Sequence, residues 1–125
     1  MADDRAGLGR YGEKLARRYL EKLGYRVLVR NYRCPAGEID LIALDERDVV
    51  FVEVKTRRSE QAQDVERAVN HPKRRQLTRT AQYYLAACPA AKKHPCRFDI
   101  VGIVCSGDGD PLIRHIRNAF APVDR

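Results

Sequence analysis

The sequence predicts an α/β domain in which a mixed sheet is flanked by helices. Three observations lead to this fold class. Two segments place apolar residues at helical spacing, five short segments have the apolar character of strands, and 125 residues suit a single domain over residues 1–125. The predicted order is helix, three strands, helix, two strands. Three successive strands indicate a meander, and the second helix indicates a crossover within the same sheet.

The first predicted helix covers residues 7–23. Its apolar residues recur at helical spacing and form one stripe, which we expect to be buried. The stripe consists of Leu8, Tyr11, Leu15, Ala16, Tyr19, Leu20 and Leu23. The opposite side carries Arg10, Lys14, Arg17 and Glu21. Gly24 follows at the position where a left-handed helix cap is expected.

The first three predicted strands cover residues 25–33, 38–44 and 49–55. A turn over residues 34–37, with the sequence Cys-Pro-Ala-Gly, separates the first strand from the second. Residues 45–48, Asp-Glu-Arg-Asp, close a hairpin between the second strand and the third.

Residues 57–71 show no clear period and predict a loop. Pro72 suits the first turn of a second helix, which extends to about Cys88. Its predicted buried stripe consists of Leu77, Ala81, Tyr84, Leu85 and Cys88. Its basic residues, predicted near the solvated face, are Lys73, Arg74, Arg75 and Arg79. Two further strands, residues 97–106 and 112–116, complete the sheet.

The chain is basic, with 24 Lys and Arg against 17 Asp and Glu and a net charge of +7. A small basic domain favours an anionic partner, of which nucleic acid is the commonest. The alternative is a soluble protein with solvated charges. The start of the chain carries acids where a signal peptide needs bases, and no apolar run reaches the length of a membrane span. We therefore expect a cytoplasmic protein with no membrane partner.

No two of the four cysteines are spaced as C-x-x-C, which favours reduced thiols. A zinc site from Cys88, His94 and Cys96 is only weakly indicated, because the spacing is irregular and a fourth ligand is not evident. Surface or structural roles are predicted for the three histidines, His71, His94 and His115.

Charged residues interrupt the second and third apolar strands: Glu38, Asp40, Glu53 and Lys55. In a symmetric hairpin Asp40 would face Glu53, and Glu38 would face Lys55, with about 4.5–5.5 Å between opposed Cβ atoms. Two facing carboxylates among apolar neighbours repel each other unless a cation lies between them. Carboxylate oxygens suit Mg²⁺ or Mn²⁺. The alternative is a chance Glu-x-Lys pattern in which Lys55 forms an ordinary salt bridge with Glu38.

Lys55 would have a chemical role beside such a metal site. Its ammonium group can orient or deprotonate an attacking water, or stabilise the negative charge that develops in a phosphorane-like transition state. A divalent metal, two acids and a lysine are the parts of a phosphodiester hydrolase. Glu13 lies at the border of the first helix's apolar stripe, next to Ala16 and Leu20. Its side chain either contacts solvent or reaches toward the strand acids.

Nucleic-acid contacts are predicted at two places. Arg57 and Arg58 follow the third strand, and the second helix carries the basic group Lys73, Arg74, Arg75 and Arg79. Several phosphate contacts would give strongly salt-dependent binding. Ordinary solvated helix charges are the alternative.

The motif Asp40, then Glu53-Val54-Lys55, on a hairpin resembles the D-x(n)-E-x-K core of the restriction-endonuclease-like, or PD-(D/E)xK, nucleases. Ile39 stands where that name has proline. Four blocks over about residues 7–120 resemble the bacterial YraN-type family, whose members are similar to archaeal Holliday-junction resolvases. They are "GRYGEKLARRYLEKLGY", "RNYRCPAGEIDLIA", "VVFVEVKTRR", and "RFDIV" through "NAF".

The resemblance implies an αβββαβ nuclease core and a Mg²⁺- or Mn²⁺-dependent endonuclease that acts on DNA, including structured or branched DNA in repair. Its catalytic residues would be Glu13, Asp40, Glu53 and Lys55, and the three acids would bind the metal. The likeness to resolvases also implies a homodimer. Two alternatives stay open: a non-catalytic nucleic-acid-binding module of the same fold, and a basic scaffold that binds an acidic protein.

Overall fold

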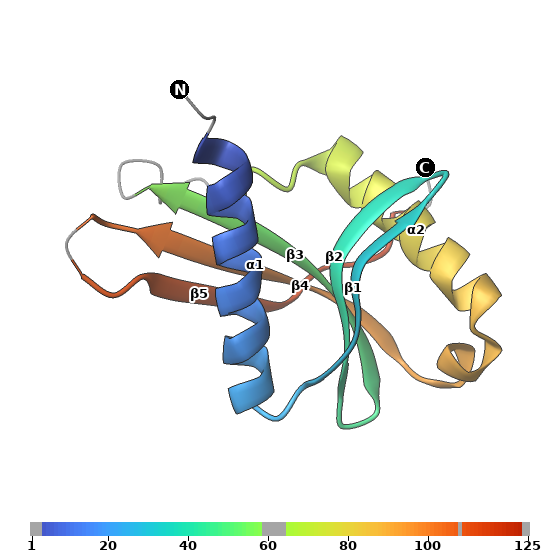
Figure 1. The fold of residues 1–125 in the computed structure, drawn as a ribbon. Helices are drawn as coiled ribbons and strands as arrows, with labels where there is room; N and C mark the ends of the chain where they lie inside the picture. Colours follow the sequence, from blue (N-terminus) through green and yellow to red (C-terminus); the bar gives the residue numbers. More distant parts are fainter. Residues whose placement is uncertain (1–3, 59–64, 108, 124–125) are drawn as a thin grey trace.

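A computed structural model describes residues 4–58, 65–107 and 109–123. It contains one five-stranded mixed sheet with a long helix on each face (Figure 1). The helices are α1 (Asp4–Lys22) and α2 (His71–Ala87), and a short 3-10 helix, η2 (Pro89–Lys93), follows α2. The strands are β1 (Arg26–Cys34), β2 (Gly37–Asp45), β3 (Asp48–Arg58), β4 (Cys96–Cys105) and β5 (Leu112–Phe120). The predicted fold class and element order are confirmed, and only η2 was not predicted.

The strands lie in the sheet in chain order, β1 to β5. Neighbouring strands are antiparallel except β3 and β4, which are parallel. A parallel pair needs a long crossover connection, and α2 lies in that connection. The predicted meander and crossover helix are therefore both present.

The β2–β3 hairpin has the predicted register, but over a shorter length than expected. Pairing runs from Asp45 with Asp48 to Leu41 with Val52, and there it ends. Beyond this point β2 and β3 separate, as Figure 1 shows. The predicted facing of Glu38 with Lys55 is wrong, because the ladder does not reach these residues. Glu38 instead lies opposite Arg33 of β1 and forms an ion pair with it at 3.5 Å.

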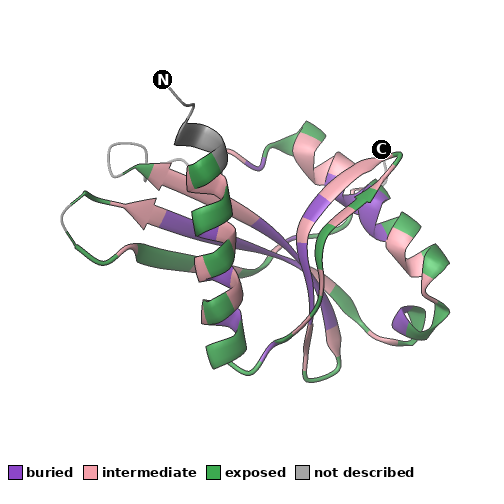
Figure 2. Ribbon diagram, in the orientation of Figure 1, coloured by how far each residue is buried: buried purple, intermediate pink, exposed green. Residues whose placement is uncertain are grey.

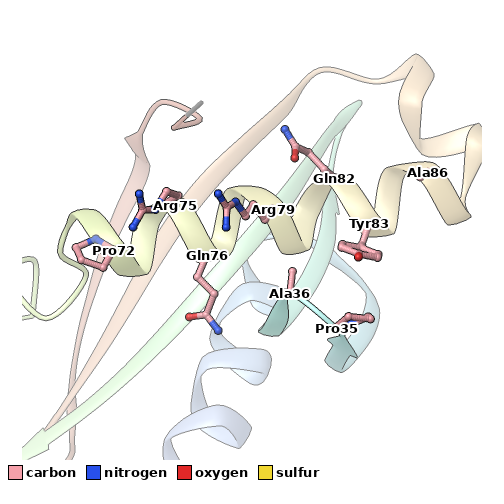
Figure 3. Close-up of a pocket in the computed structure, with 9 residues that line it drawn as sticks. All are labelled: Pro35, Ala36, Pro72, Arg75, Gln76, Arg79, Gln82, Tyr83 and Ala86. Carbon is pink, nitrogen blue, oxygen red and sulfur yellow. The ribbon is translucent and has the colours of Figure 1, made fainter. Parts of the chain in front are cut away.

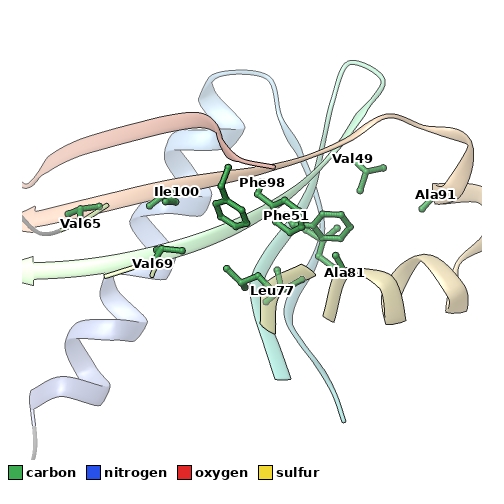
Figure 4. Packing of buried hydrophobic residues seen from close by; sticks show 12 residues of the cluster. Val49, Phe51, Val65, Val69, Leu77, Ala81, Ala91, Phe98 and Ile100 are labelled. Carbon is green, nitrogen blue, oxygen red and sulfur yellow. The ribbon is translucent and has the colours of Figure 1, made fainter. Parts of the chain in front are cut away.

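Two apolar clusters fill the space between the sheet and its helices. Side chains alternate along β3, so that Val50 and Val52 pack toward α1 while Val49 and Phe51 pack toward α2 (Figure 4). The predicted stripes supply the helices' share of the core: Ala16, Leu20, Leu77 and Ala81 are buried. The ends of the first predicted stripe are not buried. Tyr11 and Leu23 are 45% and 53% exposed, whereas buried residues are concentrated in the strands of the sheet (Figure 2).

The predicted loop over residues 57–71 is partly wrong. β3 continues to Arg58, and Val65 and Val69 are buried in the cluster under α2. The side chain of Asn70 then caps α2 by accepting a hydrogen bond from the Lys73 N–H. The central part of this loop, residues 59–64, lies outside the described residues.

His115 has partners that the sequence did not suggest. Its Nε2 lies 2.8 Å from Asp99 Oδ2 and its Nδ1 lies 3.2 Å from the Tyr19 hydroxyl. Burial alone would raise the pKa of Asp99, but hydrogen bonds from His115, Asn118 N–H and Arg97 outweigh it and lower this pKa. This hydrogen-bond network links α1 to β4 and β5.

All four cysteines lie in the described part of the chain and are free thiols. Within the described residues no helix has the length and apolar character needed to cross a membrane.

Candidate active site

The strand acids meet where β2 and β3 separate. At that point the backbone N–H of Val54 has lost its ladder partner, and Asp40 Oδ2 accepts its hydrogen bond at 2.7 Å. The Asp40 side chain thus replaces a backbone carbonyl of β2. This contact holds Asp40 beside Glu53, although the two residues lie one position beyond the last ladder pair and are not the cross-strand pair that was predicted.

Asp40 has an unusual protonation equilibrium. Burial, the charge of Glu53 and a hydrogen bond shared with Glu53 raise the pKa of Asp40 to about 8, although the bond from Val54 opposes the shift. In the absence of a further cation, Asp40 therefore holds a proton at neutral pH. Two carboxyl groups that share a proton in this way can share a metal ion instead.

Two ammonium groups neutralise Glu53, which is only 4% exposed. Lys55 Nζ and Lys73 Nζ each lie 3.3 Å from Glu53 Oε2. Lys55 is on the same face of β3 as Glu53, whereas Lys73 reaches it from the first turn of α2. Lys73 was predicted near the solvated face, but it is half-buried because α2 packs against the side of the sheet that Glu53 faces.

Glu13 approaches the strand acids from α1. The approach depends on Gly12: a Cβ atom at that position would overlap Thr56 Oγ1, so only glycine lets α1 come this close to β3. Glu13 is half-buried, and its Oε1 atom is buried and has no hydrogen-bond partner among the described residues. Burial and the charges of Glu38 and Glu53 raise the pKa of Glu13. A buried carboxylate oxygen without a partner is destabilising unless a proton or a cation neutralises it.

The residues present fit a hard divalent cation in part. Asp40 and Glu53 offer adjacent carboxylate oxygens, which Mg²⁺ and Mn²⁺ prefer. Glu13 interacts electrostatically with both. However, among the described residues no three His, Cys, Asp or Glu side chains are grouped to hold a metal, here or at Cys88, His94 and Cys96. The structure brings two of the three predicted metal ligands together and places the third nearby.

Basic side chains line a pocket together with Glu13. A pocket of about 190 Å³ between α1 and β1 is lined by Glu13 and by four cationic residues: Arg10, Lys14, Arg17 and Arg30. Sequence reasoning did not propose these residues as a binding surface. The available signal was the basic stripe opposite the apolar stripe of α1, which by itself also fits ordinary solvated charge.

The basic residues that were predicted to bind nucleic acid occupy different environments. Arg57 and Arg58 follow Lys55 by two and three residues at the end of β3. Arg75 and Arg79 line a groove beside α2. Arg74 is not at the solvated face as predicted: its Nε donates to the Val69 carbonyl at 2.8 Å, and its guanidinium lies over the Phe120 ring. Arg74 therefore has a structural role.

The fold and the site define an α/β protein in which a carboxylate–lysine cluster lies at the separation of two strands of a mixed sheet. Residues 12–103 match the model of the uncharacterised protein family UPF0102, and the chain belongs to this family. It is similar to UPF0102 proteins of Thermodesulfovibrio yellowstonii, at 43% identity over 93% of this chain and 97% of the relative, and of Symbiobacterium thermophilum, at 45% identity over 90% and 95%. A UPF0102 protein of Geobacter metallireducens is 46% identical over 90% of this chain and 91% of the relative.

These matches confirm the YraN-type family that the sequence blocks indicated. The names of the relatives give the family and no activity. The chemistry of the site is therefore the basis for assigning one.

Proposed function

We propose that this protein is a metal-dependent nuclease that hydrolyses phosphodiester bonds in DNA, with structured or branched DNA as its substrate. One observation carries the proposal: the half-buried carboxylate of Asp40 is adjacent to the buried carboxylate of Glu53, and two lysine ammonium groups contact Glu53. Such an arrangement is costly for stability, and it is the kind of cost found at functional sites. The resemblance to restriction-endonuclease-like proteins gives the same four residues the same roles.

Asp40 and Glu53 would hold Mg²⁺ or Mn²⁺, with Glu13 as a third ligand. When bound, the cation would neutralise the carboxylates and polarise a phosphate oxygen. Lys55, fixed on the rigid strand β3, would orient the attacking water or stabilise negative charge on the transition state. Lys73 would balance the charge of Glu53 and help attract the phosphate backbone.

The charge of the surroundings supports a nucleic-acid substrate. The chain carries a net charge of +7, and cationic side chains line both the α1–β1 pocket, which includes Glu13, and the groove along α2. Opposite charge attracts the backbone of DNA and would hold it near the carboxylates. The proposal includes activity in the cytoplasm, in repair or recombination, with two copies of the chain gripping a branched substrate.

A second function is favoured by a specific observation. Lys73 Nζ occupies a position 3.3 Å from Glu53 Oε2, and the three acids do not form a three-ligand cluster in the described residues. A protein in which Lys73 permanently neutralises Glu53 would be a non-catalytic nucleic-acid-binding module that keeps the nuclease fold.

A cleavage assay separates the two functions. The protein is incubated with linear, nicked, flapped and four-way-junction DNA in the presence of Mg²⁺ or Mn²⁺, with EDTA in a parallel series. Asp40→Asn, purified in the same way, controls for contaminating nucleases. We expect the parent to cut at least one branched DNA, and we expect EDTA or Asp40→Asn to abolish this. Equal cleavage by parent and variant, or binding without cleavage, would favour the module.

A further inference from the structure

A groove of about 810 Å³ lies beside α2 and faces the turn between β1 and β2 (Figure 3). Seven residues of α2 line it at helical spacing and form a second stripe next to the buried one: Pro72, Arg75, Gln76, Arg79, Gln82, Tyr83 and Ala86. Pro35 and Ala36 of the turn form the opposite wall. The volume is within the roughly 300–1,000 Å³ range of ligand clefts.

The lining is cationic and contains no acid. The side chains of Arg75 and Arg79 form no ion pair or hydrogen bond with the part of the chain that the structure describes. The 17 residues of α2 include no Asp or Glu. The two guanidinium groups are therefore available for an anion, and their planar donors match the oxygens of a phosphate or a carboxylate.

Tyr83 adds a flat aromatic surface to the groove. It is 47% exposed, while its neighbour Tyr84 packs edge-on against Tyr32 and Phe51 in the core. Core packing thus accounts for Tyr84 and leaves Tyr83 unexplained. Aromatic rings beside cationic groups are the features with which proteins bind single-stranded nucleic acid, because every base has a face that can stack. A base inside a duplex is already stacked on its neighbours, so the ring selects an unpaired one.

The groove extends along α2 to Pro72, and the next residue in the chain, Lys73, contacts Glu53 of the candidate active site. Gln76 lies against Gly37, where an added Cβ would overlap Gln76 Nε2, and Gly37 precedes Glu38. Three residues before Gln76, Lys73 reaches Glu53. A strand that lies along α2 from Tyr83 past Arg79 and Arg75 therefore arrives at the acids.

We infer that this groove binds an unpaired nucleic-acid strand, with a base stacked on Tyr83 and phosphates on Arg75 and Arg79, and directs that strand to Asp40 and Glu53. The inference rests on the proposed function, and it narrows the substrate class to DNA with an unpaired arm or flap. The amide groups of Gln76 and Gln82 supply hydrogen bonds to the same strand.

Binding measured in EDTA tests the groove without any need for cleavage. Fluorescence anisotropy compares a labelled oligo(dT) strand with a duplex of equal length. Tyr83→Ala is expected to weaken single-strand binding by roughly 5- to 150-fold, the usual effect of losing one stacking ring. Duplex binding is expected to change less than about twofold, because phosphate contacts carry it.

Two controls keep the result specific. Tyr83→Phe retains the ring and should bind like the parent. Tyr11→Ala removes an equally exposed tyrosine, 45% exposed, from α1 outside the groove and should also bind like the parent. Photocrosslinking with 5-iodouracil in place of one thymine, followed by mass spectrometry, should modify Tyr83 in the parent.

Unchanged single-strand affinity in Tyr83→Ala, or an equal loss for single strand and duplex, would overturn the inference. Its failure is distinct from failure of the proposed function. If the parent cuts DNA and Tyr83→Ala binds single strands normally, the nuclease proposal stands and the groove proposal fails. If the parent binds single strands through Tyr83 but cuts no DNA, the groove proposal stands and the nuclease proposal fails.

Discussion

At the scale of single residues, Asp40 links the folding of the protein to its proposed chemistry. The pKa of Asp40 in the folded chain is raised to about 8, whereas an unfolded chain gives an ordinary aspartate value. The folded state therefore binds a proton that the unfolded state releases. Stability from this group is fully present below the unfolded pKa and is lost as the pH rises toward 8.

The first prediction concerns Asp40→Asn in EDTA. The parent should lose stability between about pH 5 and 8, with a slope of up to about 1.4 kcal/mol per pH unit from this group. The variant should lack this contribution and be the more stable protein at pH 8, because asparagine can still accept the Val54 hydrogen bond. Urea unfolding at several pH values measures the slope. Glu21→Gln, at an exposed site on α1, is the control, and equal slopes in parent and Asp40→Asn would contradict the assignment.

The second prediction separates the two lysines on Glu53. They are matched, since both lie 3.3 Å from its Oε2 and their side chains are 23% and 28% exposed. Lys55→Ala should lower cleavage by ~10²–10³, as expected for a positioned electrostatic group, while DNA affinity falls only modestly. Lys73→Ala should stay within about tenfold of the parent at saturating DNA. Single-turnover cleavage rates of the parent and the two variants test this prediction. Activity of Lys55→Ala within twofold of the parent would show that Lys55 forms only a salt bridge.

The sequence was sufficient to predict that Asp40 and Glu53 lie close together, because hairpin register follows from a short turn and strand alternation, but it did not show that the ladder ends at Leu41 and Val52. It was not sufficient to predict the contacts of Lys73 with Glu53 or of His115 with Asp99. Their partners lie 20 and 16 residues away in the chain and on different elements, so these contacts arise only when α2 and β5 dock on the sheet. A basic residue near a helix start has the same local signal whether it faces solvent or a buried acid.

At the scale of elements, the docking of α1 on β3 places Glu13. A methyl group at Gly12 would collide with Thr56 Oγ1, and it would also lie 3.0 Å and 3.1 Å from Thr56 Cβ and Cγ2. Rotation of the Thr56 side chain does not move its Cβ atom, so the 3.0 Å contact would remain. Gly9 lies about one turn earlier in the same helix, and among the described residues a methyl group there would meet nothing beyond the adjoining helix backbone within 4 Å.

The third prediction uses this matched pair of glycines. Gly9→Ala should stabilise the protein by up to about 1 kcal/mol through helix propensity. Gly12→Ala should destabilise it by about 1–3 kcal/mol, because overpacking outweighs the same gain, and cleavage should fall as Glu13 shifts. Thermal or urea unfolding of both variants measures the difference. A stabilised Gly12→Ala would mean that α1 is not held as closely as the structure indicates.

The elements themselves were predictable to within a few residues, because their apolar periods are clear and Gly24 and Pro72 mark two helix ends. The segment after β3 was not. Val65 and Val69 lie in a turn with no regular period, and they are buried because α2 and β4 leave a space there: a Cβ at Gly102 of β4 would lie 2.8 Å from Val65. Such a fit depends on the assembled sheet and leaves no periodic pattern in the chain.

At the scale of the whole molecule, the net charge of +7 and the two basic surfaces predict binding dominated by phosphate contacts. For six or so contacts, affinity for DNA should fall by roughly 10³-fold between about 50 and 200 mM salt. Replacing both Arg75 and Arg79 by alanine should reduce the slope of log K against log salt by about 2. An affinity for DNA that does not change with salt concentration would contradict the proposal that nucleic acid is the main partner.

The central claim is that Asp40 and Glu53 together hold a divalent metal, and calorimetric titration with Mn²⁺ tests it most directly. The parent should bind Mn²⁺. Asp40→Asn and Glu53→Gln should each lose that binding while circular dichroism shows that they remain folded, and Glu21→Gln should bind like the parent. Mn²⁺ affinity unchanged in both Asp40→Asn and Glu53→Gln would contradict the claim.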